Sequence, residues 1–317
     1  MTLDPALQRM LAVSREQGGP ALNELELSDA RAAMREMFLK NGYPVNHAVE
    51  ISHMSSDACG GSFGLHIYRP AHTQGPLPTI VYFHGGGFVL GDAATYDTHS
   101  RALAHLLGAA VVFVEYRLAP EHRYPAAVQD TYAVMDYLAK EAKTLGLDRQ
   151  RIVAMGESAG GNLAVNAALH AHRIGGLRLN GLCLIYPLTD MRPLEEALDR
   201  YPSVEEFGTG TNLDLDEMQW FRENYLQSPE HGDLPENTLL FQPDLNLLPP
   251  TRIYVGACDP LRDMAVAFSS LLVENDIDAK TEILPGMMHS FMCQGTVSAA
   301  ALRHFYRVVE SLSELLK

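Results

Sequence analysis

The sequence predicts an α/β fold built on a mostly parallel central sheet that helices cover on both faces. From residue 79 onward, near-continuous apolar runs of strand length alternate with longer segments whose apolar residues have helical spacing. Strands that are apolar throughout are typical of parallel sheets, because helices bury both of their faces. The chain has 317 residues, enough for one large domain, and no linker-like stretch divides it. We therefore expect residues 1–317 to form a single domain.

Two helices and a hairpin are expected before the alternating region. Apolar residues recur at helical spacing between residues 7 and 13 and again between residues 30 and 38. Residues 47–53 and 62–69 follow as two extended segments, and the glycine pair at residues 60–61 predicts a turn between them. These segments are expected to form an antiparallel hairpin.

The alternating region is expected to supply the parallel strands and the helices that cover them. Its strand-like runs are residues 79–83, 110–115, 151–155, 182–186, 252–256 and 281–284. Helical spacing is found in residues 100–107, 126–145, 161–172, 263–275 and 299–316. Between residues 186 and 252 the alternation stops, although Met218, Trp220, Phe221, Tyr225 and Leu226 again have helical spacing. An insertion of this length is usually functional, so we expect it to fold over the sheet edge as a lid; a surface insertion without function is the alternative.

The charge of the chain is strongly acidic, with a formal net charge of −15. Residues 190–236 alone hold 13 Asp or Glu against 3 Arg. This surface would repel phosphate backbones and anionic lipids, which disfavours nucleic acid and stable membrane partners. No apolar run has the length of a membrane span, and no secretory signal is visible, so we expect a cytoplasmic protein. The four cysteines, Cys59, Cys183, Cys258 and Cys293, are widely spaced and are expected to be free thiols.

The pentapeptide Gly156-Glu157-Ser158-Ala159-Gly160 follows the predicted strand 151–155 and precedes a helical segment. This order is typical of a nucleophile elbow, a sharp turn that holds a serine Oγ out of the sheet. Ser158 is therefore the candidate nucleophile. We expect Glu157 to point away from it and to brace the turn.

A second glycine-rich turn, His84-Gly85-Gly86-Gly87, follows the predicted strand 79–83. Backbone N–H groups in such a loop can hold the oxyanion that forms when a serine attacks an acyl carbonyl. The expected donors are the N–H groups of Gly85, Gly86 and Ala159, the last of which also opens a helix whose dipole favours negative charge. Together the two turns predict serine-dependent acyl transfer, and ester hydrolysis is the reaction we expect.

The serine hydroxyl needs a base, and the base needs an orienting carboxylate. Asp259 directly follows the strand-like residues 252–256, whereas the competing Asp263 is expected to begin a helix. His289 lies in a loop after the last predicted strand, and His304 falls inside an amphipathic helix. We therefore expect Asp259 to be the acid and His289 the base.

An apolar pocket that suits uncharged esters is expected beside the nucleophile. Its candidate lining residues are Phe88, Phe207, Trp220, Phe221 and Met287.

These motifs resemble those of the hormone-sensitive-lipase-like family of α/β-hydrolases. The matches are His84-Gly85-Gly86-Gly87-Phe88, Tyr116-Arg117-Leu118-Ala119-Pro120-Glu121-His122, Gly156-Glu157-Ser158-Ala159-Gly160, Asp259-Pro260-Leu261-Arg262-Asp263 and Met288-His289-Ser290-Phe291. The resemblance implies an α/β-hydrolase fold and a carboxylesterase that acts on short- to medium-chain acyl esters without a cofactor or metal. It also implies a helical cap from about residues 1–45 and about residues 190–235. Family members often pair through an edge strand and their last helices, so a homodimer is an expectation to test.

The resemblance leaves alternatives open. The family usually has Asp or Thr where Glu157 stands, and residues 116–121 are interpreted as structural, with Glu121 in a buried ion pair. A lactonase or a deacetylase would use the same triad. A non-catalytic ligand-binding protein is a further alternative, because the plant gibberellin receptors resemble this family but lack the histidine that stands here as His289. A lipase acting at membrane interfaces is disfavoured by the acidic surface.

Overall fold

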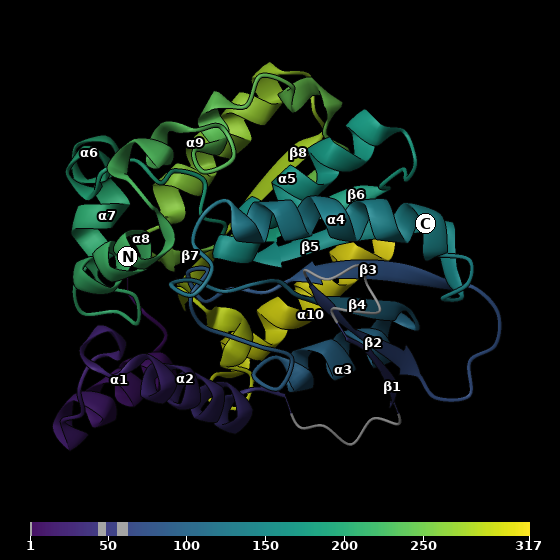
Figure 1. Ribbon diagram of the computed structural model, residues 1–317. Helices are drawn as coiled ribbons and strands as arrows, with labels where there is room; N and C mark the ends of the chain where they lie inside the picture. Colours follow the sequence, from purple (N-terminus) through teal and green to yellow (C-terminus); the bar gives the residue numbers. More distant parts are fainter. Residues whose placement is uncertain (1, 44–48, 56–62) are drawn as a thin grey trace.

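The computed structural model describes residues 2–43, 49–55 and 63–317, which surround an eight-stranded sheet (Figure 1). The strand order is β1-β2-β4-β3-β5-β6-β7-β8. The strands are β1 (Val49–Met54), β2 (Gly64–Pro70), β3 (Leu77–Phe83), β4 (Ala110–Glu115), β5 (Leu147–Glu157), β6 (Gly181–Ile185), β7 (Thr251–Cys258) and β8 (Ala279–Met288). From β4 through β3 to β8 all neighbours are parallel, whereas β1 with β2 and β2 with β4 are antiparallel. The predicted α/β class and mostly parallel sheet are confirmed.

The helices cover both faces of this sheet. They are α1 (Pro5–Gln17), α2 (Leu27–Asn41), α3 (Asp97–Leu107), α4 (Ala126–Glu141), α5 (Ala159–Ile174), α6 (Leu194–Arg200), α7 (Pro202–Phe207), α8 (Leu215–Tyr225), α9 (Arg262–Glu274) and α10 (Ala299–Leu315). In Figure 1, α4 and α5 pack side by side on one face, and α3 and α10 lie together on the other. The central strands are consequently buried, as Ile80, Val112 and Leu184 show with no exposed surface. Burial on both faces is the reason that their sequences are apolar throughout.

Several element ends differ from the sequence-based expectation. The helix after Ser158 begins at Ala159 instead of residue 161, because the elbow leads straight into α5. Strand β8 extends to Met288, past the predicted residue 284, since the pairing with β7 resumes after an irregularity and joins Cys258 to Met288. The antiparallel pairing predicted for the hairpin is confirmed between β1 and β2, while its glycine turn lies outside the described residues.

The insertion between β6 and β7 forms α6, α7 and α8, and the N-terminal helices α1 and α2 lie beside it (Figure 1). Arg15 of α1 donates a hydrogen bond to the Gly210 carbonyl oxygen. Arg31 of α2 donates to the Val89 carbonyl oxygen at 3.0 Å and pairs with Glu121 at 2.7 Å. Because Glu121 is 49% exposed, this ion pair lies at the surface and is not buried as expected. The two segments thus contact each other and the loops at the sheet edge.

Two further expectations concern the surface and the thiols. Within the described ranges, none of the helices combines the length and the apolarity that a membrane crossing requires. Of the cysteines that the structure describes, Cys183, Cys258 and Cys293, none forms a disulfide, and Cys59 lies outside the described residues.

Candidate active site

Ser158 occupies a strained turn between β5 and α5. Its backbone has φ 53° and ψ −119°, a conformation that costs a non-glycine residue on the order of 1–3 kcal/mol and persists only where the surroundings enforce it. Glycines at two neighbouring positions allow the close packing that holds Ser158 in this conformation. A Cβ on Gly156 would lie 2.0 Å from the Gly160 carbonyl oxygen, and a Cβ on Gly160 would lie 2.1 Å from that of Phe83. The strand end and the helix start therefore pack backbone against backbone, with Ser158 at the carboxyl edge of the sheet.

Ser158, His289 and Asp259 form a chain of hydrogen-bond contacts. His289 Nε2 lies 3.1 Å from Ser158 Oγ, and His289 Nδ1 lies 3.0 Å from Asp259 Oδ2. Asp259 is fully buried, and its other oxygen accepts a bond from the Leu261 N–H at 2.8 Å. With Nδ1–H donating to the carboxylate, Nε2 is the nitrogen left to accept the serine proton, which is the tautomer that a general base requires.

Asp263 and His304, the competing candidates for the acid and the base, contact other residues. Asp263 Oδ2 accepts a bond from the Ser203 N–H at 2.8 Å, and its other oxygen pairs with Arg262 at 2.8 Å. Burial acts to raise the pKa of Asp263, but the bonds from Arg262 and Ser203 outweigh it and hold the pKa below its usual value. His304 lies in α10, edge-on to Phe291. Asp263 therefore joins the start of α9 to α7, a structural contact.

Hydrogen bonds to two of its carbonyl oxygens hold the glycine loop after β3 in place. Tyr116 Oη donates to the His84 carbonyl oxygen at 2.8 Å, and His84 Nδ1 lies 2.7 Å from the Gly85 carbonyl oxygen. Because C=O and N–H of a trans peptide point in opposite directions, the N–H groups of Gly85 and Gly86 are turned away from these partners. A Cβ on Gly85 would lie 3.3 Å from Ser158 Cβ, so this loop packs directly on the elbow.

His84 is part of this support and not of the reacting groups. Its ring stacks on Phe113 and Tyr116, with centroid distances of 5.2 and 4.3 Å. Burial lowers the pKa of His84 to about 4, so the ring is neutral at neutral pH and Nδ1–H can donate to the loop. The stack gives Tyr116 a structural role that sequence alone did not supply. Arg117, the next residue, pairs with buried Asp130 at 2.6 Å.

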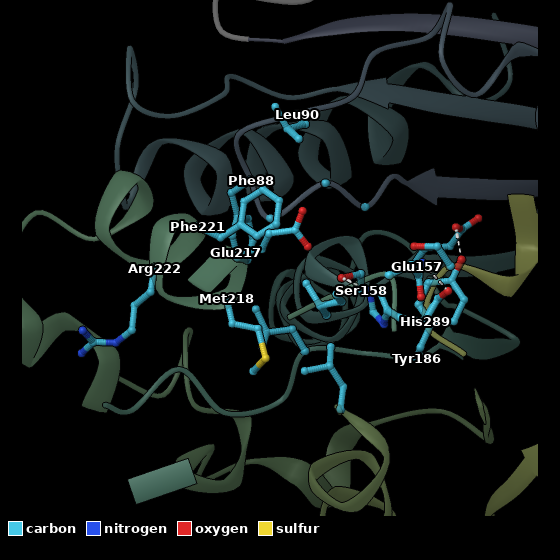
Figure 2. A pocket seen from close by; sticks show the side chains of 18 of the residues that line it. Phe88, Leu90, Glu157, Ser158, Tyr186, Glu217, Met218, Phe221, Arg222 and His289 are labelled. Carbon is cyan, nitrogen blue, oxygen red and sulfur yellow. Dashed lines mark hydrogen bonds between the residues drawn. The ribbon is translucent and has the colours of Figure 1, made fainter. Parts of the chain in front are cut away.

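Glu157 lies buried behind the triad. It accepts hydrogen bonds from Tyr82 Oη and, at 2.6 Å, from Tyr186 Oη. Burial raises the pKa of both tyrosines, and the Glu157 charge raises it further, so both hydroxyls remain donors. The Tyr186 ring lies 4.6 Å from the His289 ring, and Figure 2 shows the Glu157 carboxylate turned toward Tyr186 and away from Ser158. Glu157 therefore acts on His289 indirectly, because it holds the Tyr186 ring that packs beside the imidazole.

Ser158 and His289 open into a cavity of about 1080 Å³, its open mouth included. Its walls come from the loops at the sheet edge and from helices α2, α6 and α8. Apolar side chains dominate the lining, among them Phe38, Phe88, Leu188, Met218, Phe221 and Met264. A mostly apolar wall interrupted by polar groups suits a small molecule with an apolar body.

The structure brings only part of the expected pocket residues to this cavity. Phe88 and Phe221 line it, whereas Phe207, Trp220 and Met287 lie outside the lining. Phe207 is buried at the end of α7, and Met287 is fully buried within β8. Trp220 directly precedes Phe221 on α8, and the two rings are in edge-to-face contact with centroids 5.1 Å apart, but of the two it is Phe221 that lines the cavity. Ala159, an expected oxyanion donor, is the buried first residue of α5 and opens that helix beside Ser158.

Sequence reasoning missed Glu217, a buried carboxylate that points into the cavity from α8 (Figure 2). Its Oε2 accepts from the Asp214 N–H at 3.3 Å, and its own N–H donates to Asp214 Oδ1 at 2.9 Å. Burial, followed by the Asp214 charge, raises the pKa of Glu217 to about 7. The Asp-x-x-Glu spacing was visible and indicates a helix start, but not that this turn would face Ser158.

Comparison with known proteins assigns the family. A family model described as the alpha/beta hydrolase fold matches residues 80–293, more than half of the chain. The chain belongs to this family. The hormone-sensitive-lipase-like resemblance is confirmed by curated relatives. "Ethyl acetate hydrolase" of Pseudomonas putida is 32% identical, with all of both chains covered. "Carboxylesterase NlhH" of Mycobacterium tuberculosis is 35% identical over 80% of this chain and 78% of its own.

Solved structures agree with this assignment. A hyperthermophilic esterase from the archaeon Pyrobaculum calidifontis superposes with a TM-score of 0.89 and 31% sequence identity over 99% of both chains. A thermostable esterase from Pseudomonas putida superposes with a TM-score of 0.90 and 28% identity over 100% of this chain and 98% of that one. The α/β-hydrolase fold is therefore established, and the hydrolase belongs among the carboxylic ester hydrolases.

Proposed function

We propose that this hydrolase is a serine carboxylesterase that cleaves short- to medium-chain acyl esters through an acyl-enzyme on Ser158. The observation that carries the proposal is the contact chain from Ser158 through His289 to Asp259 at one end of a mostly apolar cavity. The names of two relatives, an ethyl acetate hydrolase and a carboxylesterase, support a small ester as substrate.

The first half of the reaction forms the acyl-enzyme. His289 Nε2 takes the proton of Ser158 Oγ as the oxygen attacks the acyl carbonyl, and Asp259 stabilises the imidazolium. The N–H groups of Gly85, Gly86 and Ala159 hold the oxyanion; in other serine hydrolases one such donor contributes about 10²–10³ to kcat. His289 then gives its proton to the leaving alkoxide, and the acyl group remains on Ser158.

The second half repeats these steps with water. His289 Nε2 takes a proton from the water that attacks the acyl carbon, and the same N–H groups hold the second oxyanion. Ser158 Oγ leaves the acyl carbon and recovers its proton from His289. The products are a carboxylic acid and the free enzyme.

We further propose that residues 1–45 and 190–235 act as a cap that bounds the acyl site. Met34 of α2 and Met218 and Phe221 of α8 line the cavity. Asn212 Nδ2 donates to the His289 carbonyl oxygen at 2.8 Å, so the insertion also holds the loop that carries the base. Closure by these helices favours acyl chains short enough to fit beneath them.

The test is hydrolysis of p-nitrophenyl acetate, butyrate, octanoate and palmitate by the wild type and by Ser158→Ala. We expect rates to be highest on the shorter chains, and Ser158→Ala to lower kcat on the order of 10⁶-fold. Ser100→Ala is the matched control, because Ser100 is a buried serine of α3 whose Oγ has no hydrogen-bond partner among the described residues. It should keep most of the activity.

Each part of the proposal can fail separately. A rate maximum on palmitate would contradict the chain-length assignment but not the mechanism. Unchanged turnover in Ser158→Ala would exclude this serine as the nucleophile. Intact-mass measurement after brief reaction with a p-nitrophenyl ester should find an acyl adduct on the wild type that is missing from Ser158→Ala.

A further inference from the structure

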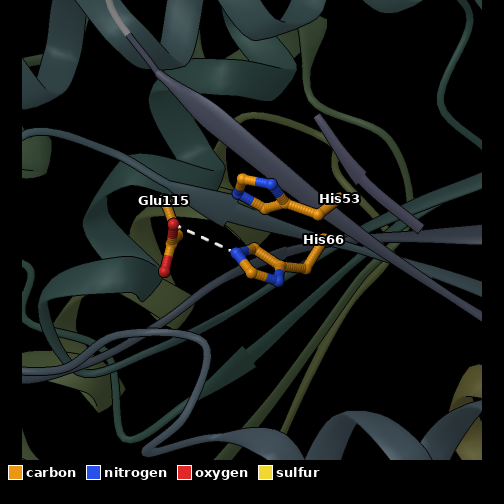
Figure 3. A group of neighbouring side chains, drawn as sticks. All are labelled: His53, His66 and Glu115. Atoms are coloured by element: carbon orange, nitrogen blue, oxygen red, sulfur yellow. Dashed lines mark ion pairs between the residues drawn. The ribbon is translucent and has the colours of Figure 1, made fainter. Parts of the chain in front are cut away.

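Two histidines and a glutamate meet on one face of the sheet, in the part that β1, β2 and β4 form (Figure 3). His53 of β1 pairs directly with His66 of β2, and His66 in turn pairs with Phe113 of β4. Glu115 lies two residues beyond Phe113, so its side chain projects on the same face as His66. Strands β1, β2 and β4 stand at one end of the sheet order, on the other side of β3 from β5, β7 and β8, which carry the triad.

The donor atoms of the three side chains are close together. One ligand atom from each lies within 4.8 Å of the others. The His53 and His66 ring centroids are 4.4 Å apart, and Figure 3 shows a nitrogen of each ring facing the Glu115 carboxylate. His66 Nε2 lies 3.1 Å from Glu115 Oε2.

His66 Nε2 is a buried nitrogen without a well-formed hydrogen bond. Within the described part of the chain its contact is the ion pair with Glu115 Oε2 at 3.1 Å. Buried polar atoms are nearly always paired, and each exception calls for a physical explanation. A cation between the three side chains would satisfy this nitrogen.

We propose that His53, His66 and Glu115 bind one divalent transition-metal ion of the Zn²⁺ class. Two imidazole nitrogens and a carboxylate oxygen are a donor set that zinc and its neighbours in the first transition series accept, whereas Mg²⁺ and Ca²⁺ prefer oxygen ligands. Zinc bonds of about 2.0–2.2 Å in tetrahedral geometry place ligand atoms roughly 3.3 Å apart. His53 is exposed, so rotation of its side chain can close the remaining distance.

The surroundings also fit a structural metal ion. Glu115 Oε1 accepts a bond from the Ala93 N–H at 3.1 Å, which orients the carboxylate as outer-shell partners of metal ligands do. Strand β1 is an edge strand with four exposed positions in its middle. Little apolar burial holds such a strand, so a metal ion that joins it to β2 and β4 would add stability. Three protein ligands leave a fourth position for water.

The experiment is titration of the chelator-treated full-length protein with Zn²⁺, followed by calorimetry and by metal analysis after dialysis. We expect one ion per chain in the wild type. His53→Ala and His66→Ala should each weaken binding by at least the roughly 10- to 100-fold that loss of an outer-shell partner costs. His122→Ala, which removes an exposed histidine elsewhere, should bind like the wild type. Co²⁺ in place of Zn²⁺ should give visible d–d absorption that both site variants lose.

Three results would overturn the proposal. One is the absence of a stoichiometric ion in the wild type. Another is binding that survives in His53→Ala, which would place the ion elsewhere, for instance on His289. The third is a Zn²⁺-dependent rise in the unfolding temperature that is equal in the wild type and in His53→Ala. Circular dichroism of each variant reports whether it is folded, and since His53 is exposed, its variant remains informative if His66→Ala does not fold.

Discussion

Replacing Glu217 by glutamine removes a negative charge that is unfavourable in the buried wall of the cavity. The carboxylate is buried beside Asp214, and these surroundings raise the pKa of Glu217 from 4.5 to about 7. Glutamine keeps the side-chain length and a carbonyl oxygen that can accept from the Asp214 N–H, as capping boxes with glutamine do. The substitution therefore isolates the effect of the charge.

The expected change in folding stability follows from the pKa shift of Glu217. Between about pH 4.5 and pH 7 the folded chain holds a proton on Glu217 that the unfolded chain has released, so the stability contribution of this group falls as the pH rises. Each pKa unit is worth about 1.4 kcal/mol, which gives a loss of up to about 3 kcal/mol that is complete above pH 7. Glu217→Gln should then be more stable than the wild type by that amount at pH 8, and equal to it below about pH 4.5.

Urea unfolding at a series of pH values measures this difference. The midpoint should separate from that of the wild type as the pH rises, with an unchanged m-value. Asp216→Asn is the control, because Asp216 is an exposed carboxylate in the same turn of α8. A Glu217→Gln stability difference that is independent of pH, or one that grows as the pH falls, would refute the reasoning.

Three further predictions concern the elbow, its brace and the cavity wall. Gly160→Ala should destabilise the fold by about 3 kcal/mol or more, because its Cβ would lie 2.1 Å from the Phe83 carbonyl oxygen; wild-type thermal stability would contradict this packing. Glu157→Gln should lower kcat more than it raises KM, because an amide NH₂ replaces one of the two oxygens that accept from Tyr82 and Tyr186 and so weakens the hold on Tyr186 beside His289; steady-state kinetics that show only a KM effect would count against it. Phe221→Ala should shift the preference toward longer acyl chains, by about 0.8 kcal/mol for each additional CH₂ that is buried; an unmoved optimum in the ester series would exclude Phe221 as a limit to chain length.

Much of the fold could be predicted because its signals are local. The parallel strands are buried on both faces, so their apolar runs were visible without knowledge of their neighbours. Gly156 and Gly160 mark the elbow because a Cβ at either would clash with backbone atoms. Asp259 and His289 were placed by the strands they follow, since the carboxyl ends of parallel strands meet at one edge.

The cavity wall could not be predicted in the same way. Helical spacing in residues 218–226 indicated a helix but not which side would face Ser158, so Phe221 and Trp220 were treated alike although only Phe221 lines the cavity. The burial of Glu217 and Glu157 depends on side chains from distant segments and is not encoded in any nearby pattern.

The sequence by itself determined the order of strands and helices, the strained serine turn and the residue types of the triad, because short-range sterics and apolar periodicity specify them. Only the tertiary structure decided which side chains share a space. His53, His66 and Glu115 are brought together by the pairing of three strands, and the N-terminal helices reach the insertion through contacts such as that of Arg15 with Gly210. Strand register and helix rotation arise from the packing of the whole chain, and they set the distances on which binding and catalysis depend.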